Sequence, residues 1–166
     1  HNTIMAACLT PGKTVIHNAA LEPEVIDLIK MLSKMGAKFE GVGTRTLTVY
    51  GVDKLHGTEF TPVPDRIETM TFIAAATVTK SKIFLKNAQA DLLKPELDLL
   101  APSAVSVEQK ADGLMVDATG AHLKATSIIT GPYPEFATDN QSLFCAILAL
   151  AEGESVVYEK IDRKSV

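Results

Sequence analysis

The chain has 166 residues, 46% of them hydrophobic and 22% charged, the balance of a globular protein with one domain or two small ones. Sixteen Lys and Arg against twenty Asp and Glu give a net charge of −4, which argues against a general grip on nucleic acid phosphates. The composition also excludes disorder, and the longest apolar run, residues 143–151, is much shorter than the roughly 20 residues of a membrane span. We therefore expect a folded protein whose partners are neither nucleic acid nor membrane.

The first half of the chain predicts a regular order of helices and strands. Residues 3–18 are typical of an apolar helix, a polar break and a strand. Apolar residues then recur every three or four positions from Leu21 to Met35, which predicts an amphipathic helix that begins near Pro23 and ends at Gly36. Two strands around a GVG turn and a second helix follow, at 37–40, 46–50 and 65–78.

The second half repeats this order. Residues 71–87 match residues 3–18, and Asn87 corresponds to Asn18 at the end of the strand. The next predicted elements are a helix at 91–100, strands at 105–108, 114–117 and 123–129, and a helix at 139–151. A third helix, break and strand occupy residues 142–160. We therefore predict an α/β (α+β) fold of repeated βαββ-type units, and interpret the chain as a fragment of a longer repeat array.

Cysteine and histidine usage predicts no disulfide framework and no metal site. Cys8 and Cys145 both lie in apolar, helix-like stretches, which is typical of buried thiols in a reduced, cytoplasmic protein. The four histidines have no ligand spacing, and no CxxC pair, HExxH motif or nucleotide-binding glycine loop is present. The sequence therefore offers no metal ligands.

Two aspartates occupy equivalent places in the two halves. Asp65 and Asp139 each precede an apolar helix, where Asp is favoured because its carboxylate accepts backbone N–H bonds as an N-cap. The alternative is a carboxylate that takes a proton from a bound hydroxyl. Arg66, beside Asp65, is a candidate to pair with an acid or to hold an anion. Periodicity leaves these interpretations open.

Three long strings resemble a known family: NAALEPEVIDLIKMLSKMGAKFEGVGT, VPDRIETMTFIAAA, and PYPEFATDNQSLF followed by AEGESVVYEKI. In this order and spacing they are similar to the UDP-N-acetylglucosamine 1-carboxyvinyltransferase family of enolpyruvyl transferases. The resemblance implies an inside-out α/β barrel of two domains, each with three repeats whose helices turn inward. It further implies that residues 1–62 end one family domain with its repeat unit, and that residues 63–166 lead into the second. The remainder of the two-domain enzyme would then be missing.

The resemblance also implies a reaction. Family members move the enolpyruvyl group of phosphoenolpyruvate to the 3-hydroxyl of UDP-N-acetylglucosamine and release phosphate, a cytoplasmic step of peptidoglycan precursor synthesis that needs no metal or cofactor. Asp139 in ATDNQ matches the family aspartate near that hydroxyl, which implies a general base and substrate contact. Ile161 matches a position that contacts the uridine part. Four further residues match charged positions at or near the family's cleft: Glu22, Glu24, Asp65 and Arg66.

The chain also departs from the family pattern. Neither Cys8 nor Cys145 matches the reactive loop cysteine of the family, and Asn140 stands where an apolar residue is common. In the closing IDRKSV, Arg163 lies two positions early, so no arginine contact is carried over to it. We therefore expect the chain alone to be inactive, with a catalytically inactive remnant or interaction module of the same fold as the alternative. A shikimate-type transferase would need a cluster of basic phosphate ligands, which the sequence does not show.

Overall fold

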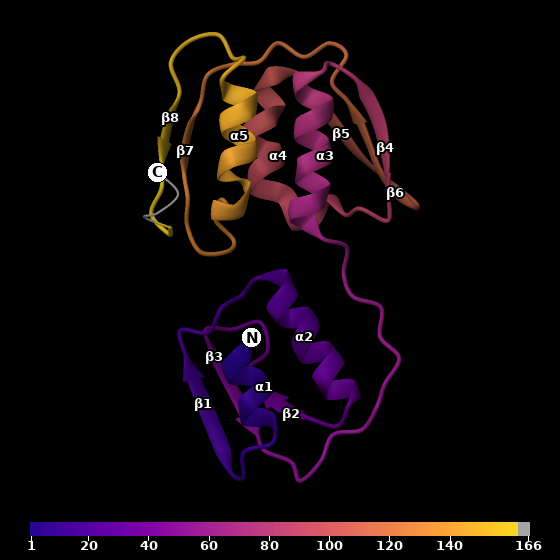
Figure 1. Cartoon of the computed structure of the whole chain (residues 1–166), viewed down its shortest axis with the longest axis vertical. Helices are drawn as coiled ribbons and strands as arrows, with labels where there is room; N and C mark the ends of the chain where they lie inside the picture. The colour runs from indigo at the N-terminus through magenta and orange to yellow at the C-terminus, as the bar shows by residue number, and fades with distance from the viewer. Residues whose placement is uncertain (163–166) are drawn as a thin grey trace. The chain divides into compact units, whose positions relative to one another are not determined.

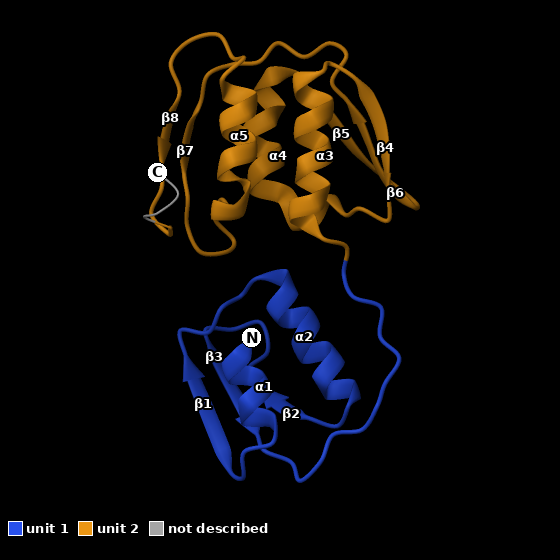
Figure 2. Cartoon of the chain, viewed as in Figure 1, with its two compact units in different colours: residues 1–63 blue, residues 64–166 orange. Residues whose placement is uncertain are grey.

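The computed structural model describes residues 1–162 and divides into two compact units, His1–Val63 and Pro64–Val166 (Figures 1 and 2). Arg163 therefore lies outside the described residues. The first unit contains α1 (Asn2–Cys8), β1 (Lys13–His17), α2 (Pro23–Lys34), β2 (Lys38–Glu40) and β3 (Thr46–Tyr50). The second, in which η marks a 3₁₀ helix, contains α3 (Arg66–Val78), β4 (Lys82–Lys86), η1 (Ala90–Leu93), α4 (Lys94–Leu100), η2 (Ala101–Ser103), β5 (Ser106–Lys110), β6 (Gly113–Asp117), β7 (Ser127–Ile129), η3 (Thr138–Asn140), α5 (Gln141–Leu148) and β8 (Val156–Tyr158).

The two units share one sheet topology, which confirms the predicted repeat. In each three-stranded antiparallel sheet the strand that comes last in the chain lies in the middle, in the orders β1-β3-β2 and β4-β6-β5. Asn18 and Asn87 both follow the first strand with positive φ values of 54° and 62°. β7 and β8 form a separate parallel pair. The assignment of each unit to a family domain stays a prediction.

The sequence of α2 explains both of its ends. Pro23 is the first helical residue, where its missing N–H leaves no partner unsatisfied. Gly36 follows the helix with a φ of +102°, a conformation that side chains with a Cβ rarely adopt. The Gly36 N–H donates to Ser33 O and the Ala37 N–H to Leu32 O, both at 3.0 Å, so the last carbonyls are satisfied as in a Schellman motif. The predicted end of this helix is therefore confirmed.

The core of the second unit positions the segment that carries Asp139. α3 and α5 pack together between the three-stranded sheet and the β7–β8 pair (Figure 1). Phe136, in the loop before η3, meets Phe144 of α5 edge to face, with ring centroids 4.9 Å apart. Both rings are buried, so the loop that leads to Asp139 is fixed to the helix that follows it.

Three predictions in this unit are wrong in detail. The predicted strand 123–129 is reduced to β7, because the residues before β7 form only one isolated parallel bridge, between Lys124 and Glu152. The predicted helix 139–151 is a 3₁₀ turn followed by the shorter α5. Cys145 is exposed, since it points away from the face of α5 that buries Phe144, whereas Cys8 is buried as expected.

No helix within residues 1–162 is long and apolar enough to cross a membrane.

Candidate functional site

Asp139 lies in the turn η3 with an exposed carboxylate. Within the described residues this carboxylate makes no hydrogen bond or ion pair, and the N-cap of α5 is Asn140, whose side chain makes no capping bond. Asp65, by contrast, caps α3: its Oδ1 accepts the N–H bonds of Ile67 at 2.8 Å and Glu68 at 3.1 Å. The capping interpretation is therefore confirmed for Asp65 and wrong for Asp139, whose carboxylate is available to a ligand.

The carboxylate of Glu159 joins the Asp139 turn to the segment after β8. Its Oε2 accepts the hydroxyl of Thr138 at 2.8 Å, and its Oε1 accepts the hydroxyl of Thr130 at 2.7 Å. Oε1 also accepts the backbone N–H groups of Ile161 at 2.6 Å and Asp162 at 2.9 Å. Ile161 and Thr138, the residue before Asp139, are thus both bonded to one carboxylate.

A second carboxylate, that of Glu96 in α4, contacts the η3 turn from the core. Glu96 is 1% exposed, and its Oε1 accepts the side-chain N–H of Asn140 at 2.8 Å and the N–H of Ala137 at 3.5 Å. Asn140 is completely buried, and its Oδ1 has no hydrogen-bond partner among the described residues. Asn140, which stands where the family commonly has an apolar residue, is thus bonded to Glu96. The turn is held from two sides, by Glu96 through Asn140 and by Glu159 through Thr138.

Arg66 and the two glutamates of the first unit are placed differently. Arg66 is buried at the start of α3, with its guanidinium carbon 5.8 Å from the ring centroid of Tyr133, in the loop that leads to η3. Glu22 is the N-cap residue of α2, without a side-chain capping bond, and Glu24 lies in the first turn. The described geometry of the Asp139 site therefore comes from the second unit.

Sequence reasoning missed Glu159 and Glu96. Glu159 stands inside the quoted string AEGESVVYEKI, but nothing in its spacing shows that two threonine hydroxyls 21 and 29 positions away bond to it. Among residues 1–162, no three His, Cys, Asp or Glu side chains are grouped so that they could hold a metal ion.

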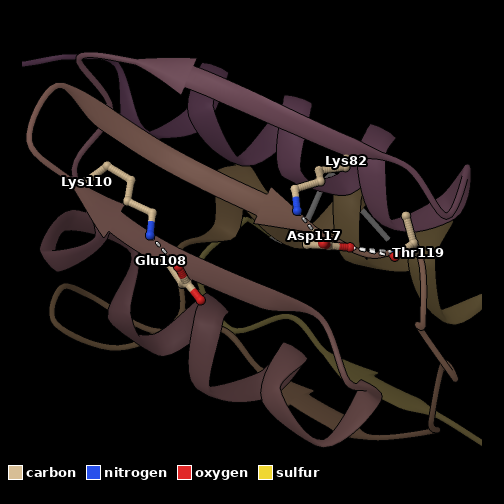
Figure 3. A network of polar contacts seen from close by, with 5 residues as sticks. All are labelled: Lys82, Glu108, Lys110, Asp117 and Thr119. Atoms are coloured by element: carbon tan, nitrogen blue, oxygen red, sulfur yellow. Dashed lines mark hydrogen bonds and ion pairs between the residues drawn. The ribbon is translucent and has the colours of Figure 1, made fainter.

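A second polar network lies on the β4–β6–β5 sheet (Figure 3). Lys82 Nζ donates to Asp117 Oδ2 at 2.8 Å, and Asp117 Oδ1 accepts the Thr119 hydroxyl at 2.6 Å and its N–H at 3.1 Å. The bond from Lys82, followed by those from Thr119, lowers the pKa of Asp117 to about 2. Lys110 similarly lowers the pKa of Glu108.

Glu159 has a low pKa for a related reason. Desolvation raises the pKa of Glu159, but the hydrogen bonds from Thr130, Asp162, Ile161 and Thr138 outweigh it and bring the value to about 2. Because hydroxyl and amide groups donate to the ionised form, protonation of this carboxyl weakens all four bonds at once.

We expect acid to destabilise the chain through Asp117 and Glu159. Their ordinary pKa values of 3.8 and 4.5 fall to about 2 in the folded protein, so the unfolded chain binds these protons first. The stabilisation is present above about pH 4.5 and is lost as the pH falls towards 2. Urea unfolding of wild type, Asp117→Asn and Glu159→Gln between pH 6 and 2 measures it, and each variant should show a shallower loss. Variant curves that run parallel to wild type over the whole range would contradict this assignment.

Comparisons with known proteins show the family to which the chain belongs. The family model described as EPSP synthase (3-phosphoshikimate 1-carboxyvinyltransferase) matches residues 1–164. The chain is 44% identical over 160 residues to a UDP-N-acetylglucosamine 1-carboxyvinyltransferase of Novosphingobium aromaticivorans, covering 96% of this chain and 37% of the relative. It is 46% identical to one of Aeromonas salmonicida, covering 96% of this chain and 38% of the relative.

A solved structure supports the same relationship. The enolpyruvyl transferase NikO from Streptomyces tendae matches with a TM-score of 0.80 and 27% identity, covering 92% of this chain and 37% of that one. The chain spans less than two fifths of the length of these relatives. The match of the family model to residues 1–164, together with the predicted repeat topology, shows that this chain belongs to the EPSP synthase family of enolpyruvyl transferases.

Proposed function

We propose that this chain is the part of a UDP-N-acetylglucosamine 1-carboxyvinyltransferase that supplies the general base, Asp139. The whole protein would transfer the enolpyruvyl group of phosphoenolpyruvate to the 3-hydroxyl of UDP-N-acetylglucosamine, in the cytoplasm, for peptidoglycan precursor synthesis. The observation that carries the proposal is an exposed carboxylate without a protein partner in the described residues, on a turn anchored from two sides. The names of the relatives at 44% and 46% identity support the substrates.

The proposed chemistry requires one group that accepts a proton and one that donates it. Asp139 accepts the proton of the 3-hydroxyl while the oxygen of that hydroxyl forms a bond to C2 of phosphoenolpyruvate. The methylene carbon takes a proton from an acid elsewhere in the whole protein, which gives a tetrahedral intermediate. The resulting methyl group then returns a proton to the conjugate base of that acid while the C2–O bond to phosphate breaks, which restores the double bond and releases inorganic phosphate. No step requires a metal or a cofactor.

The other predicted site residues take part in substrate binding in this proposal. Ile161 is 49% exposed, so its aliphatic side chain is accessible to the uridine part of the sugar nucleotide. We assign Glu22, Glu24, Asp65 and Arg66 to the charged surroundings of the substrates. The Asp65 carboxylate has a structural role as well, because one of its oxygens caps α3.

The proposal is tested with the protein expressed from the complete reading frame that contains these 166 residues. Phosphate release from phosphoenolpyruvate is measured with UDP-N-acetylglucosamine or with shikimate 3-phosphate as the acceptor, and we expect release only with the sugar nucleotide. Release only with shikimate 3-phosphate would instead indicate the shikimate-type reaction. The inactive remnant or interaction module would be indicated by a folded protein that releases phosphate with neither acceptor and whose melting temperature is unchanged when either is added. The 166-residue chain alone should show no turnover.

A further inference from the structure

Glu159 accepts more hydrogen bonds from different segments than a cap of a single element would need. Its donors come from the end of β7 (Thr130), from η3 (Thr138), and from the backbone after β8 (Ile161 and Asp162). Thr130 is completely buried, and its Oγ1 also accepts the N–H of Lys160 at 2.8 Å. One end of the network is therefore fixed in the core, while the other end holds the residue next to Asp139.

We propose that Glu159 is a positioning residue that fixes Asp139 relative to Ile161 through the hydroxyl of Thr138. The inference rests on the proposed function, in which Asp139 takes the acceptor proton and Ile161 contacts the same sugar nucleotide. An ionised carboxylate accepts on both oxygens and donates on neither, which suits a junction where every neighbour is an N–H or O–H donor. Its bonds to these donors are charge-assisted and are stronger than neutral ones.

The expected benefit is geometric. A general base must stay within hydrogen-bond distance of the hydroxyl that it deprotonates, and a displacement of about 1 Å costs on the order of 100-fold in rate. Asp139 is exposed, and its side chain makes no hydrogen bond or ion pair within residues 1–162, so its position depends on its neighbours in η3. Thr138 is held by Glu159 and Asn140 by Glu96, and only Glu159 also bonds to the segment that contains Ile161.

The test removes one hydroxyl and then restores it. Thr138→Val keeps the shape of the side chain but loses the donor to Glu159, whereas Thr138→Ser keeps the donor. Thr119→Val is a matched control, because the Thr119 hydroxyl donates in the same way to Asp117 at the end of β6, and the pKa of Asp117 is also about 2 (Figure 3). The kinetics are measured on the protein from the complete reading frame, and the structural readouts on the 166-residue chain.

We expect Thr138→Val to lower kcat by about 10- to 100-fold with little change in KM, and Thr138→Ser to restore most of it. In the chain itself, NMR should show a higher pKa for Glu159 and faster amide hydrogen exchange at Asn140, whose N–H bonds to Ala137 O. Thr119→Val should raise the pKa of Asp117 and leave kcat and the Asn140 exchange unchanged.

The inference is overturned by unchanged kcat and exchange in Thr138→Val, or by an equal loss of kcat in Thr119→Val. A loss of stability in Thr138→Val with an unchanged kcat would make Glu159 merely structural, and this also overturns it. If the wild-type protein has no activity with the sugar nucleotide, the proposed function fails. The exchange and pKa measurements on Thr138→Val then decide separately whether Glu159 holds the turn.

Discussion

Asp139→Asn should lower kcat for phosphate release by about 100- to 10,000-fold in the protein from the complete reading frame, the range that general base catalysis contributes. An amide of the same shape cannot accept the proton of the acceptor hydroxyl. Because the Asp139 carboxylate makes no hydrogen bond or ion pair within residues 1–162, the substitution should not change the stability of the fold. We therefore expect the melting temperature of the variant to match that of wild type, and KM to change far less than kcat.

Asp117→Asn is the matched control for this experiment. It makes the same chemical change at a carboxylate of the β4–β6–β5 sheet, which is bonded to Lys82. At pH 7 it should leave kcat unchanged while it weakens the sheet network. An Asp139→Asn enzyme with wild-type turnover would exclude Asp139 as the base and move the search to another carboxylate of the whole protein.

Asn140→Leu should destabilise the second unit by about 3 kcal/mol, because it leaves the buried carboxylate of Glu96 without its closest donor. The remaining donor, the N–H of Ala137, lies at 3.5 Å, which is too long to replace the lost bond. Urea denaturation of the 166-residue chain at pH 7 measures the loss. The same variant should also lower kcat in the whole protein, since Asn140 is the residue after Asp139.

The double variant Glu96→Leu/Asn140→Leu separates the buried bond from simple packing. Since it removes both polar partners, it should regain stability relative to Asn140→Leu by on the order of 1–2 kcal/mol, which a double-mutant cycle with Glu96→Leu quantifies. Strictly additive losses would show that Glu96 and Asn140 do not depend on each other. The cycle also tests whether the family's common apolar residue at position 140 requires an apolar partner at position 96.

Local signals were enough to predict the elements whose causes are local. The apolar spacing of α2, its proline and its glycine end are all contained in one stretch of sequence, as is the acid that caps α3. The repeat was visible because the order of elements recurs, and the two sheets then follow the same pairing. These are features in which each residue acts on neighbours a few positions away.

The organisation of the site depends on longer separations, and there the sequence was insufficient. The aspartates at 65 and 139 both precede an apolar helix in sequence, yet only Asp65 caps its helix, because a 3₁₀ turn precedes α5 and places Asp139 one residue before the N-cap, Asn140. Glu159 and Glu96 acquire their partners only when α4, η3 and β8 pack together. Such grouping is set by tertiary packing, which a periodic pattern does not encode.

The strand order has a consequence for how the chain folds. β3 and β6 occupy the centres of their sheets although each is the last strand of its sheet to be made. The β2–β3 and β5–β6 hairpins close over residues 41–45 and 111–112 alone, whereas β1 and β4 must reach the same central strands across an intervening helix. Short loops cost less entropy to close, so each hairpin is expected to form first and the earliest strand to dock last. During synthesis on the ribosome, β1 and α2 would therefore leave the exit tunnel before the strand with which β1 pairs. Neither three-stranded sheet can be completed until its central strand has left the tunnel.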